Sequence, residues 1–204
     1  MKKSKVLFLS LVAIVICGVF FCFLFSKSFM VINNFNMADI AEMNIGAEMP
    51  KILYADTQKV VLYGTCGVLV YSLEERNITN RIDFEWFDRI NVLYPECKVS
   101  IDGKNIYISE ENIVLYKYNI TSKLLTSCFE IKEPLYYVES TNILENQDLK
   151  NYIDFNYLLG ENVAKTENKL IYLRAKKDWS MSSLQIMVFD INSYQSEIYN
   201  IFTN

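Results

Sequence analysis

The chain has 204 residues, of which 51% are hydrophobic and 14% aromatic, and this composition excludes an intrinsically disordered protein. Six Gly and three Pro exclude a collagen-like or linker-dominated architecture. The formal net charge is −4 and no basic stripe is present, so we expect no nucleic-acid partner. The sequence contains no His, which removes the commonest general base and the commonest metal ligand.

The N-terminal segment MKKSKVLFLSLVAIVICGVFFCFLF contains a 20-residue, mostly apolar run from Val6 to Phe25. At about 1.5 Å per residue a helix of this length reaches roughly 30 Å, the thickness of a bilayer's hydrocarbon core. Three lysines precede the run and favour a cytoplasmic N-terminus. We therefore predict a single-pass membrane helix in residues 1–26, a cell-membrane location and an extracytoplasmic C-terminal domain.

A cleaved signal peptide is the alternative, with Ser26, Lys27 and Ser28 as a small-x-small site. The apolar region of a signal peptide has only about 7–15 residues, so an uncleaved anchor is favoured. Cys17 and Cys22 lie inside the run without the small residues that precede a lipidated cysteine, and we interpret them as apolar residues of the helix. Residues 27–50 are expected to form a spacer.

From Lys51 onward, short runs of alternating apolar residues are separated by turn-prone residues. Asp56 and Asp102 stand at equivalent places in two similar segments, 46 residues apart, and Tyr71 and Tyr118 are 47 apart. The alternation predicts strands, and Asp-Gly at position 102 is a strong hairpin signal. In the second segment the strands are expected over Cys97–Ile101, Asn105–Ser109, Ile113–Asn119 and Lys123–Ile131.

A third copy of this unit is degraded but recognisable, with Phe189 at the place of the two equivalent tyrosines. Its missing first strand is sought in residues 152–160, and a polar loop, KKDWSMS, separates its second and third strands. The second, third and fourth strands are expected over Asn168–Ala175, Ser183–Ile191 and Gln195–Phe202.

A period near 46 residues with four strands per unit is typical of propeller blades. The stretch NIYISEENIVLYKYNITSKLLTSC resembles the tyrosine–valine–threonine–asparagine (YVTN) type of β-propeller repeat. VVLYGTCGVLVYSLEERNITNRI is similar to it and to quinoprotein-type blades, although it lacks their closing Trp. The resemblance covers residues 51–131 and, in part, 168–202. It implies an all-β domain over residues 51–204, built from antiparallel four-stranded blades in an incomplete propeller-like array of about three blades.

An ordinary β-sandwich or meander and a mixed α+β fold are the alternatives. Propellers typically have four to eight blades, so three units form an open array, share a ring between two chains, or close into a short barrel-like structure. We favour the open array. Its end units would expose apolar faces, which predicts a protein partner or self-association.

Three cysteines follow the apolar run, namely Cys66, Cys97 and Cys128, and their spacing is not that of a zinc ribbon. Two of them can pair in an exported domain, but buried free thiols are favoured over a disulfide. We expect no metal site and no cofactor.

The run RIDFEWFDRI holds Asp83, Glu85 and Asp88, which suit a hard cation or acid–base chemistry if they converge. The favoured interpretation is a charged connector whose acids pair with Arg81 and Arg89. No nucleophile motif accompanies these acids, and His is absent, so catalysis is not expected.

Trp86 and Phe87 in this connector, and Trp179 in the polar loop, are the candidate ligand or partner contacts, because loops on a rigid scaffold often carry binding residues. The alternative is that the tryptophans are packing plugs between blades. The sequence thus predicts a membrane-anchored, extracytoplasmic binding or sensing module without catalysis. A subunit or remnant that completes a larger propeller assembly is the second hypothesis, and a carboxylate-based hydrolase using Asp83 and Asp88 is the third.

Overall fold

The computed structural model describes residues 29–30, 50–64, 67–84, 95–138, 163–175 and 180–202. Over these ranges the chain is all-β: it forms three antiparallel sheets and one short 3₁₀ helix, η4 (Met181–Ser183). None of the helical structure in these ranges is long and apolar enough to cross a membrane. The expected membrane helix in residues 1–26 lies outside the ranges described.

The first sheet is a meander of neighbouring strands in chain order, as the alternation predicts. Its tight turns follow from local chemistry: the Asp56 carboxylate accepts hydrogen bonds from the backbone N–H groups of Gln58 and Lys59, both at 2.7 Å. Its strands are β2 (Lys51–Ala55), β3 (Lys59–Gly64), β4 (Gly67–Ser72) and β5 (Asn77–Ile82).

The second sheet has the same meander and one additional strand. Strand β1 (Phe29–Met30), from the segment expected to be a spacer, pairs antiparallel with β9, with Phe29 opposite Leu125 and Met30 opposite Leu124. The spatial order is therefore β1-β9-β8-β7-β6. The other strands are β6 (Glu96–Val99), β7 (Asn105–Glu110), β8 (Ile113–Asn119) and β9 (Leu124–Ser127).

The third sheet corrects one expectation. Its first strand is β10 (Ala164–Lys165), downstream of residues 152–160, which lie outside the described ranges. Because β10 has only two residues, it carries no alternation that a sequence pattern can detect. The remaining strands are β11 (Lys169–Arg174), β12 (Gln185–Asp190) and β13 (Gln195–Asn200).

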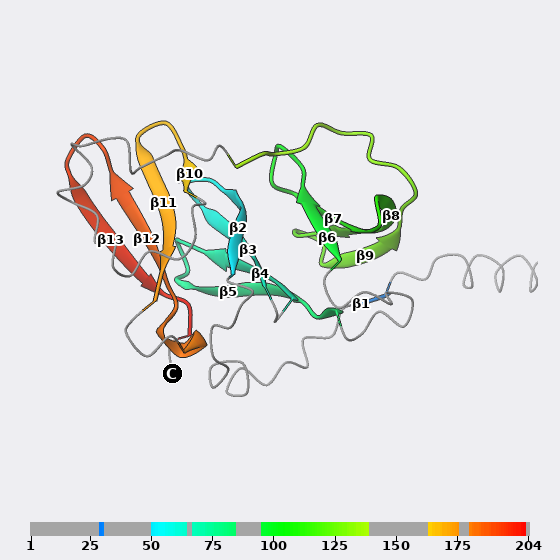
Figure 1. Ribbon diagram of the computed structural model, residues 1–204, viewed down its shortest axis with the longest axis horizontal. Helices are drawn as coiled ribbons and strands as arrows, with labels where there is room; N and C mark the ends of the chain where they lie inside the picture. The colour runs from blue at the N-terminus through cyan, green and yellow to red at the C-terminus, as the bar shows by residue number, and fades with distance from the viewer. Residues whose placement is uncertain are drawn as a thin grey trace, which may run out of the picture.

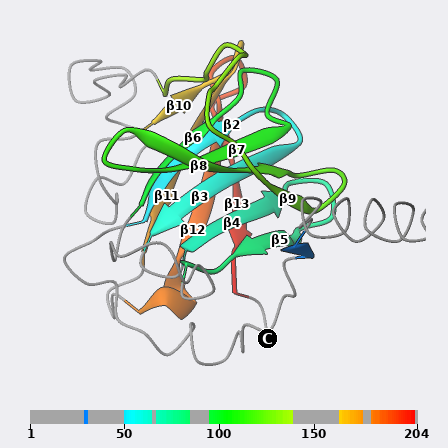
Figure 2. The ribbon, with the colours of Figure 1, turned by 90° about the vertical axis from the view of Figure 1, so that its right-hand side faces the viewer.

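The first sheet lies between the other two, so the sheets are not stacked in chain order (Figures 1 and 2). Side chains on alternating positions of β3 enter two different cores. Val60 and Leu62 face the third sheet, whereas Val61 and Tyr63 face the second sheet. The first sheet is consequently apolar on both faces, which explains the uninterrupted hydrophobic runs of β3 and β4.

The contacts between neighbouring sheets repeat. In the second sheet, the Tyr118 hydroxyl accepts a hydrogen bond from Nδ2 of Asn80, on the outermost strand of the first sheet (3.0 Å). In the first sheet, the equivalent Tyr71 hydroxyl donates to the backbone oxygen of Asn200, on the outermost strand of the third sheet (3.3 Å). Phe189 holds the same place in the third sheet and is buried. The three units are therefore structurally equivalent and stack in one direction.

The outer faces of the two end sheets expose apolar surface only in part. On the outer face of the third sheet Phe189 and Met187 are buried, whereas Ile198, opposite Met187, is 44% exposed. The outer face of the second sheet carries a polar row in register across β6, β7, β8 and β9. That row consists of Lys98, Tyr107, Lys117 and Thr126.

Candidate functional site

The segment Cys128–Val138, here called the strap, leaves β9, the neighbour of the edge strand β1, and joins the opposite edge of the second sheet beside β6. The Ile101 N–H donates to the Pro134 oxygen at 2.9 Å, and the Tyr136 N–H donates to the Val99 oxygen at 2.8 Å. In Figure 1 the strap arcs from the end of β9 over the top of the molecule towards β10. The strap therefore spans the polar face of the second sheet.

Glu133 fastens the strap to this face. Its Oε1 atom accepts hydrogen bonds from the Tyr107 hydroxyl and from Nδ2 of Asn105 (2.8 Å), and it pairs with Nζ of Lys117 at 3.4 Å. The three partners come from β7 and β8, where their strand positions direct them to the same face. Because three donors converge on its Oε1 atom, this carboxylate fixes the middle of the strap to the sheet.

The electrostatics of Glu133 follow from these contacts. The Tyr107 hydrogen bond lowers the pKa of Glu133 most, and the Lys117 charge and Asn105 lower it further, although partial burial opposes them. Burial, together with the Glu133 charge, raises the pKa of Tyr107 well above its usual value. At neutral pH the pair is therefore a carboxylate and a neutral phenol joined by a charge-assisted hydrogen bond.

The far end of the strap ties the three sheets together. The Tyr136 ring packs on Tyr54 of β2 with the ring centroids 4.6 Å apart, and its hydroxyl donates to the Ala55 oxygen at 3.5 Å. Two residues further on, Val138 packs against the core between the first and third sheets. The strap is thus fixed at its middle by Glu133 and at its end by two cores.

Tyr54 also contacts the turn between β6 and β7 of the second sheet. Gly103 has φ +66° and lies so close that an added Cβ would stand 2.4 Å from Cζ of Tyr54. The Tyr54 hydroxyl donates to Oδ2 of Asp56 at 2.9 Å. Burial and this carboxylate raise the pKa of Tyr54. The Asp-Gly pair recognised in the sequence therefore serves both the turn and the contact between the first two sheets.

Large apolar side chains are exposed on and beside this rigid strap. Phe129 is 88% exposed and Tyr137 is 74% exposed, and both belong to the strap. Ile101, which is 58% exposed, lies beside the strap where its backbone bonds to Pro134. Tyr137 and Ile101 are at the end of the strap that joins β6, whereas Phe129 is at the end that leaves β9.

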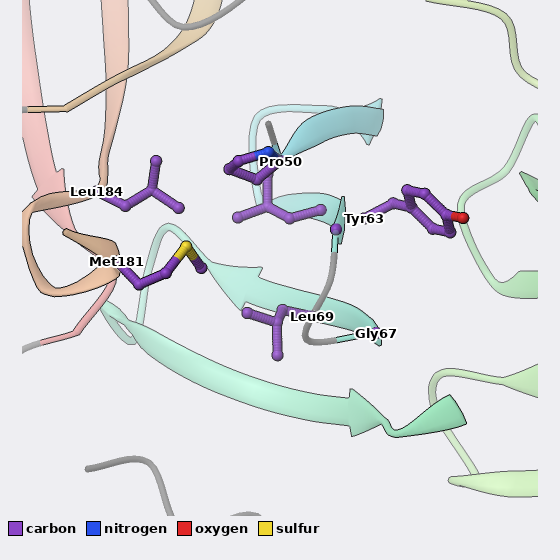
Figure 3. A pocket seen from close by; sticks show the side chains of 8 residues that line it. Pro50, Tyr63, Gly67, Leu69, Met181 and Leu184 are labelled. Atoms are coloured by element: carbon purple, nitrogen blue, oxygen red, sulfur yellow. The ribbon is translucent and has the colours of Figure 1, made fainter. Parts of the chain in front are cut away.

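A small crevice between the first and third sheets is a weaker candidate site (Figure 3). Its empty volume is about 190 Å³, including space open to solvent. The Tyr63 hydroxyl points away from it and donates to the Pro95 oxygen at 2.8 Å. Without polar groups to orient a ligand, the crevice does not have the character of a small-molecule site. It is lined by Pro50, Leu62, Tyr63, Gly64, Gly67, Leu69, Met181 and Leu184.

The contact residues expected from the sequence, Trp86, Phe87 and Trp179, lie outside the described residues, so their role stays a prediction. The same holds for Glu85 and Asp88, the carboxylates expected near Asp83. Over the ranges that the structure describes, no cluster of His, Cys, Asp or Glu is arranged to hold a metal ion.

The prediction of buried free thiols is confirmed for Cys97, and in part for Cys128. Cys97 is buried in β6 and Cys128 is half-buried at the start of the strap, and both are free. Burial strongly raises the pKa of the Cys97 thiol, so it is not a reactive nucleophile. Cys66 lies outside the described ranges.

Sequence reasoning missed Glu133, Phe129 and Tyr137. They lie in FEIKEPLYYV, whose first three residues belong to the end of the expected fourth strand, Lys123–Ile131. That strand, β9, ends at Ser127 instead, so Phe129 belongs to the strap. A signal was present: Pro134 ends any continuing strand, and the apolar residues that follow it require burial or a partner.

The chain was compared with protein-family models, curated proteins and solved structures, and none of these matches it.

Proposed function

We propose that this chain is a membrane-anchored, extracytoplasmic binding or sensing module without catalysis. The apolar run from Val6 to Phe25, after three lysines, supports a single-pass anchor with a cytoplasmic N-terminus. The anchor places the three sheets outside the cell membrane. The described carboxylate with the most side-chain partners, Glu133, is engaged in holding the strap, which favours binding over catalysis.

The scaffold is an incomplete β-propeller of about three blades. In a ring, the first blade touches both the second blade and the last one. The first sheet here has these two neighbours, and the Tyr118 and Tyr71 contacts run in the same direction from sheet to sheet. This order is expected for three blades of a ring whose opening lies between the second and third sheets.

The observation that carries the binding proposal is the exposure of Tyr137 on a strap that Glu133 and Tyr136 hold in place. A rigid Tyr contributes a large contact area at a low cost in conformational entropy. With Ile101 beside the strap, it forms an apolar contact surface that fits a protein partner. Trp86, Phe87 and Trp179 are proposed as further contacts of the same module.

Photo-crosslinking from Tyr137 tests this proposal. The full chain carries Tyr137→p-benzoylphenylalanine in membranes of the source cells, and Tyr194, which is 51% exposed on the third sheet, is the matched control position. We expect a discrete protein adduct from position 137 that is at least fivefold weaker from position 194 and in an Ile101→Asp background. Equal adduct yields at both positions would contradict a contact surface at the strap.

A subunit that completes a larger assembly is the second candidate function. It is favoured by the number of sheets, because a closed propeller needs at least four blades. Light scattering on the detergent-solubilised full chain separates the two functions. A monomer supports the binding module, and a stable dimer supports a ring shared between copies.

A further inference from the structure

The pairing of β1 with β9 fixes the place where the chain enters the second sheet. Phe29 lies four residues after Phe25, where the apolar run ends. Four residues span at most about 14 Å, so the membrane surface must be within that distance of Phe29 if the run crosses the bilayer. The second sheet is therefore the membrane-proximal part of the domain.

The strand register shows which end of this sheet faces the anchor. Because β9 is antiparallel to β1, the chain from Leu125 to Phe129 returns in the direction from which β1 is entered. Tyr116 of β8 pairs with Ser127, so Ile113, three residues earlier, extends towards the same end. At about 3.3 Å per residue, Phe129, two residues past the end of β9, and Ile113 extend at most roughly 13–17 Å past Leu125, so they can reach a membrane surface that lies within about 14 Å of Phe29.

These two side chains are exposed, by 88% for Phe129 and 64% for Ile113. They come from different segments, the strap and the hairpin between β7 and β8, and each projects from the anchor-side end of the sheet. Exposed large apolar side chains next to a membrane anchor suit the boundary between headgroups and acyl chains, where they are removed from water.

The charges at this end restrict the kind of lipid. Glu130 pairs with Lys132 at 3.7 Å and Glu96 pairs with Lys98 at 3.0 Å, so these charges offset each other. The hairpin residues Glu110 and Glu111 add two acidic groups. Lys27, in the link between Phe25 and Phe29, adds one basic group, so these three residues leave one net negative charge at this end, which opposes the approach of an anionic bilayer.

We propose that the anchor-side end of the second sheet is a lipid-contact surface, in which Phe129 and Ile113 enter the interface of a bilayer with electrically neutral headgroups. The proposal rests on the membrane anchor of the proposed function. The contact holds the domain in one orientation, so that the other end of the strap, with Tyr137, stays accessible to a partner.

The test uses the full chain reconstituted in phosphatidylcholine vesicles, with Phe129→p-benzoylphenylalanine as the probe. Tyr194→p-benzoylphenylalanine is the control, because Tyr194 is exposed but lies on the third sheet, separated from the second sheet by the first. We expect lipid adducts from position 129 at least fivefold above those from position 194. Replacing two fifths of the lipid by phosphatidylglycerol should lower the yield at 129 at least twofold, and Glu110→Gln/Glu111→Gln should restore it.

Each other outcome overturns the proposal. Equal lipid labelling at both positions means that this end does not meet the bilayer, and chain-to-chain adducts from position 129 mean that a second copy covers it. Alkaline carbonate extraction of the unmodified chain keeps the two proposals distinguishable. A chain that is released by carbonate lacks the anchor and contradicts the proposed function, whereas a retained chain without lipid adducts contradicts only the lipid-contact surface.

Discussion

The first and second sheets share one topology, but the residues on their faces are shielded from solvent in different ways. In the first sheet both faces are apolar, so neighbouring residues such as Val60 and Val61 enter different cores. In the second sheet Ile106 faces a core, while Tyr107 faces the strap and is nevertheless only 2% exposed. Among the described residues, every buried side-chain nitrogen or oxygen has a hydrogen-bond partner. A sheet position can thus be buried either by packing or by a hydrogen-bonded cover, and the two should respond differently to mutation.

Removing apolar volume from the first sheet should have the largest effect. Leu62→Ala deletes a side chain that is 2% exposed in the core facing the third sheet, and we expect a loss of about 3 kcal/mol in the free energy of unfolding. Leu124→Ala, at a position that is 38% exposed on β9, is the matched control and should cost less than about 1 kcal/mol. Urea unfolding of the full chain in detergent, followed by circular dichroism, measures both. Equal losses would contradict the two-sided packing of the first sheet.

A backbone test of the same sheet should have the next largest effect. Gly67 has φ +90° and an added Cβ would lie 2.0 Å from the Ile82 oxygen, so Gly67→Ala should destabilise the fold by about 2 kcal/mol. Gly64 pairs with Gly67, and its added Cβ would meet Pro50 at an ordinary 3.4 Å. Gly64→Ala is therefore the control and should change stability by less than about 1 kcal/mol. Similar melting temperatures for the two variants would argue against the close approach of β4 to β5.

The hydrogen-bonded cover of the second sheet should be sensitive to pH. Glu133→Gln removes the charge that holds the strap, and we expect a loss of about 1–2 kcal/mol at pH 7. Because folding lowers the pKa of Glu133 below its usual 4.5, this contribution is complete above pH 4.5 and is lost as the pH falls further. Unfolding midpoints of the wild type and the variant at pH 7 and pH 3.5 should therefore converge at the lower pH.

Glu130→Gln is the control for this experiment. Glu130 is exposed on the same strap and contacts Lys132, not the sheet. Its loss should leave the unfolding midpoint nearly unchanged at either pH. A Glu130 variant as unstable as the Glu133 variant would mean that overall charge, not the contact with Tyr107, stabilises the strap.

The smallest expected effect concerns the repeated contact between sheets. Tyr118→Phe removes one of the two acceptors of the buried Asn80 amide group, which keeps its bond to the Ile120 oxygen, and should cost about 1 kcal/mol. Tyr71→Phe removes a longer hydrogen bond, at 3.3 Å, and should cost about half as much. Thermal unfolding of both variants measures the difference. A larger loss for Tyr71→Phe would contradict the ranking of the two interfaces.

The strands were largely predictable because their signals are local. Alternation and the Asp-Gly turn located β7 and β8 within one residue, and the 46-residue spacing identified equivalent units. The spatial order of the sheets was not predictable, because identical alternation is compatible with either neighbour. Strands β1 and β10 have two residues each, too few for any periodicity.

The candidate site was less predictable than the fold. The hydrogen-bond and ion-pair partners of Glu133 lie on β7 and β8, 16 to 28 residues away in sequence. The residues that flank Glu133 in the sequence do not indicate these contacts. Tyr136 and Tyr137 are adjacent and chemically identical, yet one packs on Tyr54 and the other is exposed. Only the path of the strap across the sheet distinguishes them.

The Tyr71–Asn200 contact joins the first sheet to β13, which follows the first sheet by more than 100 residues in sequence. During synthesis, β5 is complete more than 80 residues before the third sheet begins at Ala164. Until then, the side of the first sheet that carries Val60 and Leu62 has no third sheet to cover it. Completion of this core therefore waits until β10 to β13 have been synthesised, and a nascent chain stalled before that point would expose apolar surface to chaperones.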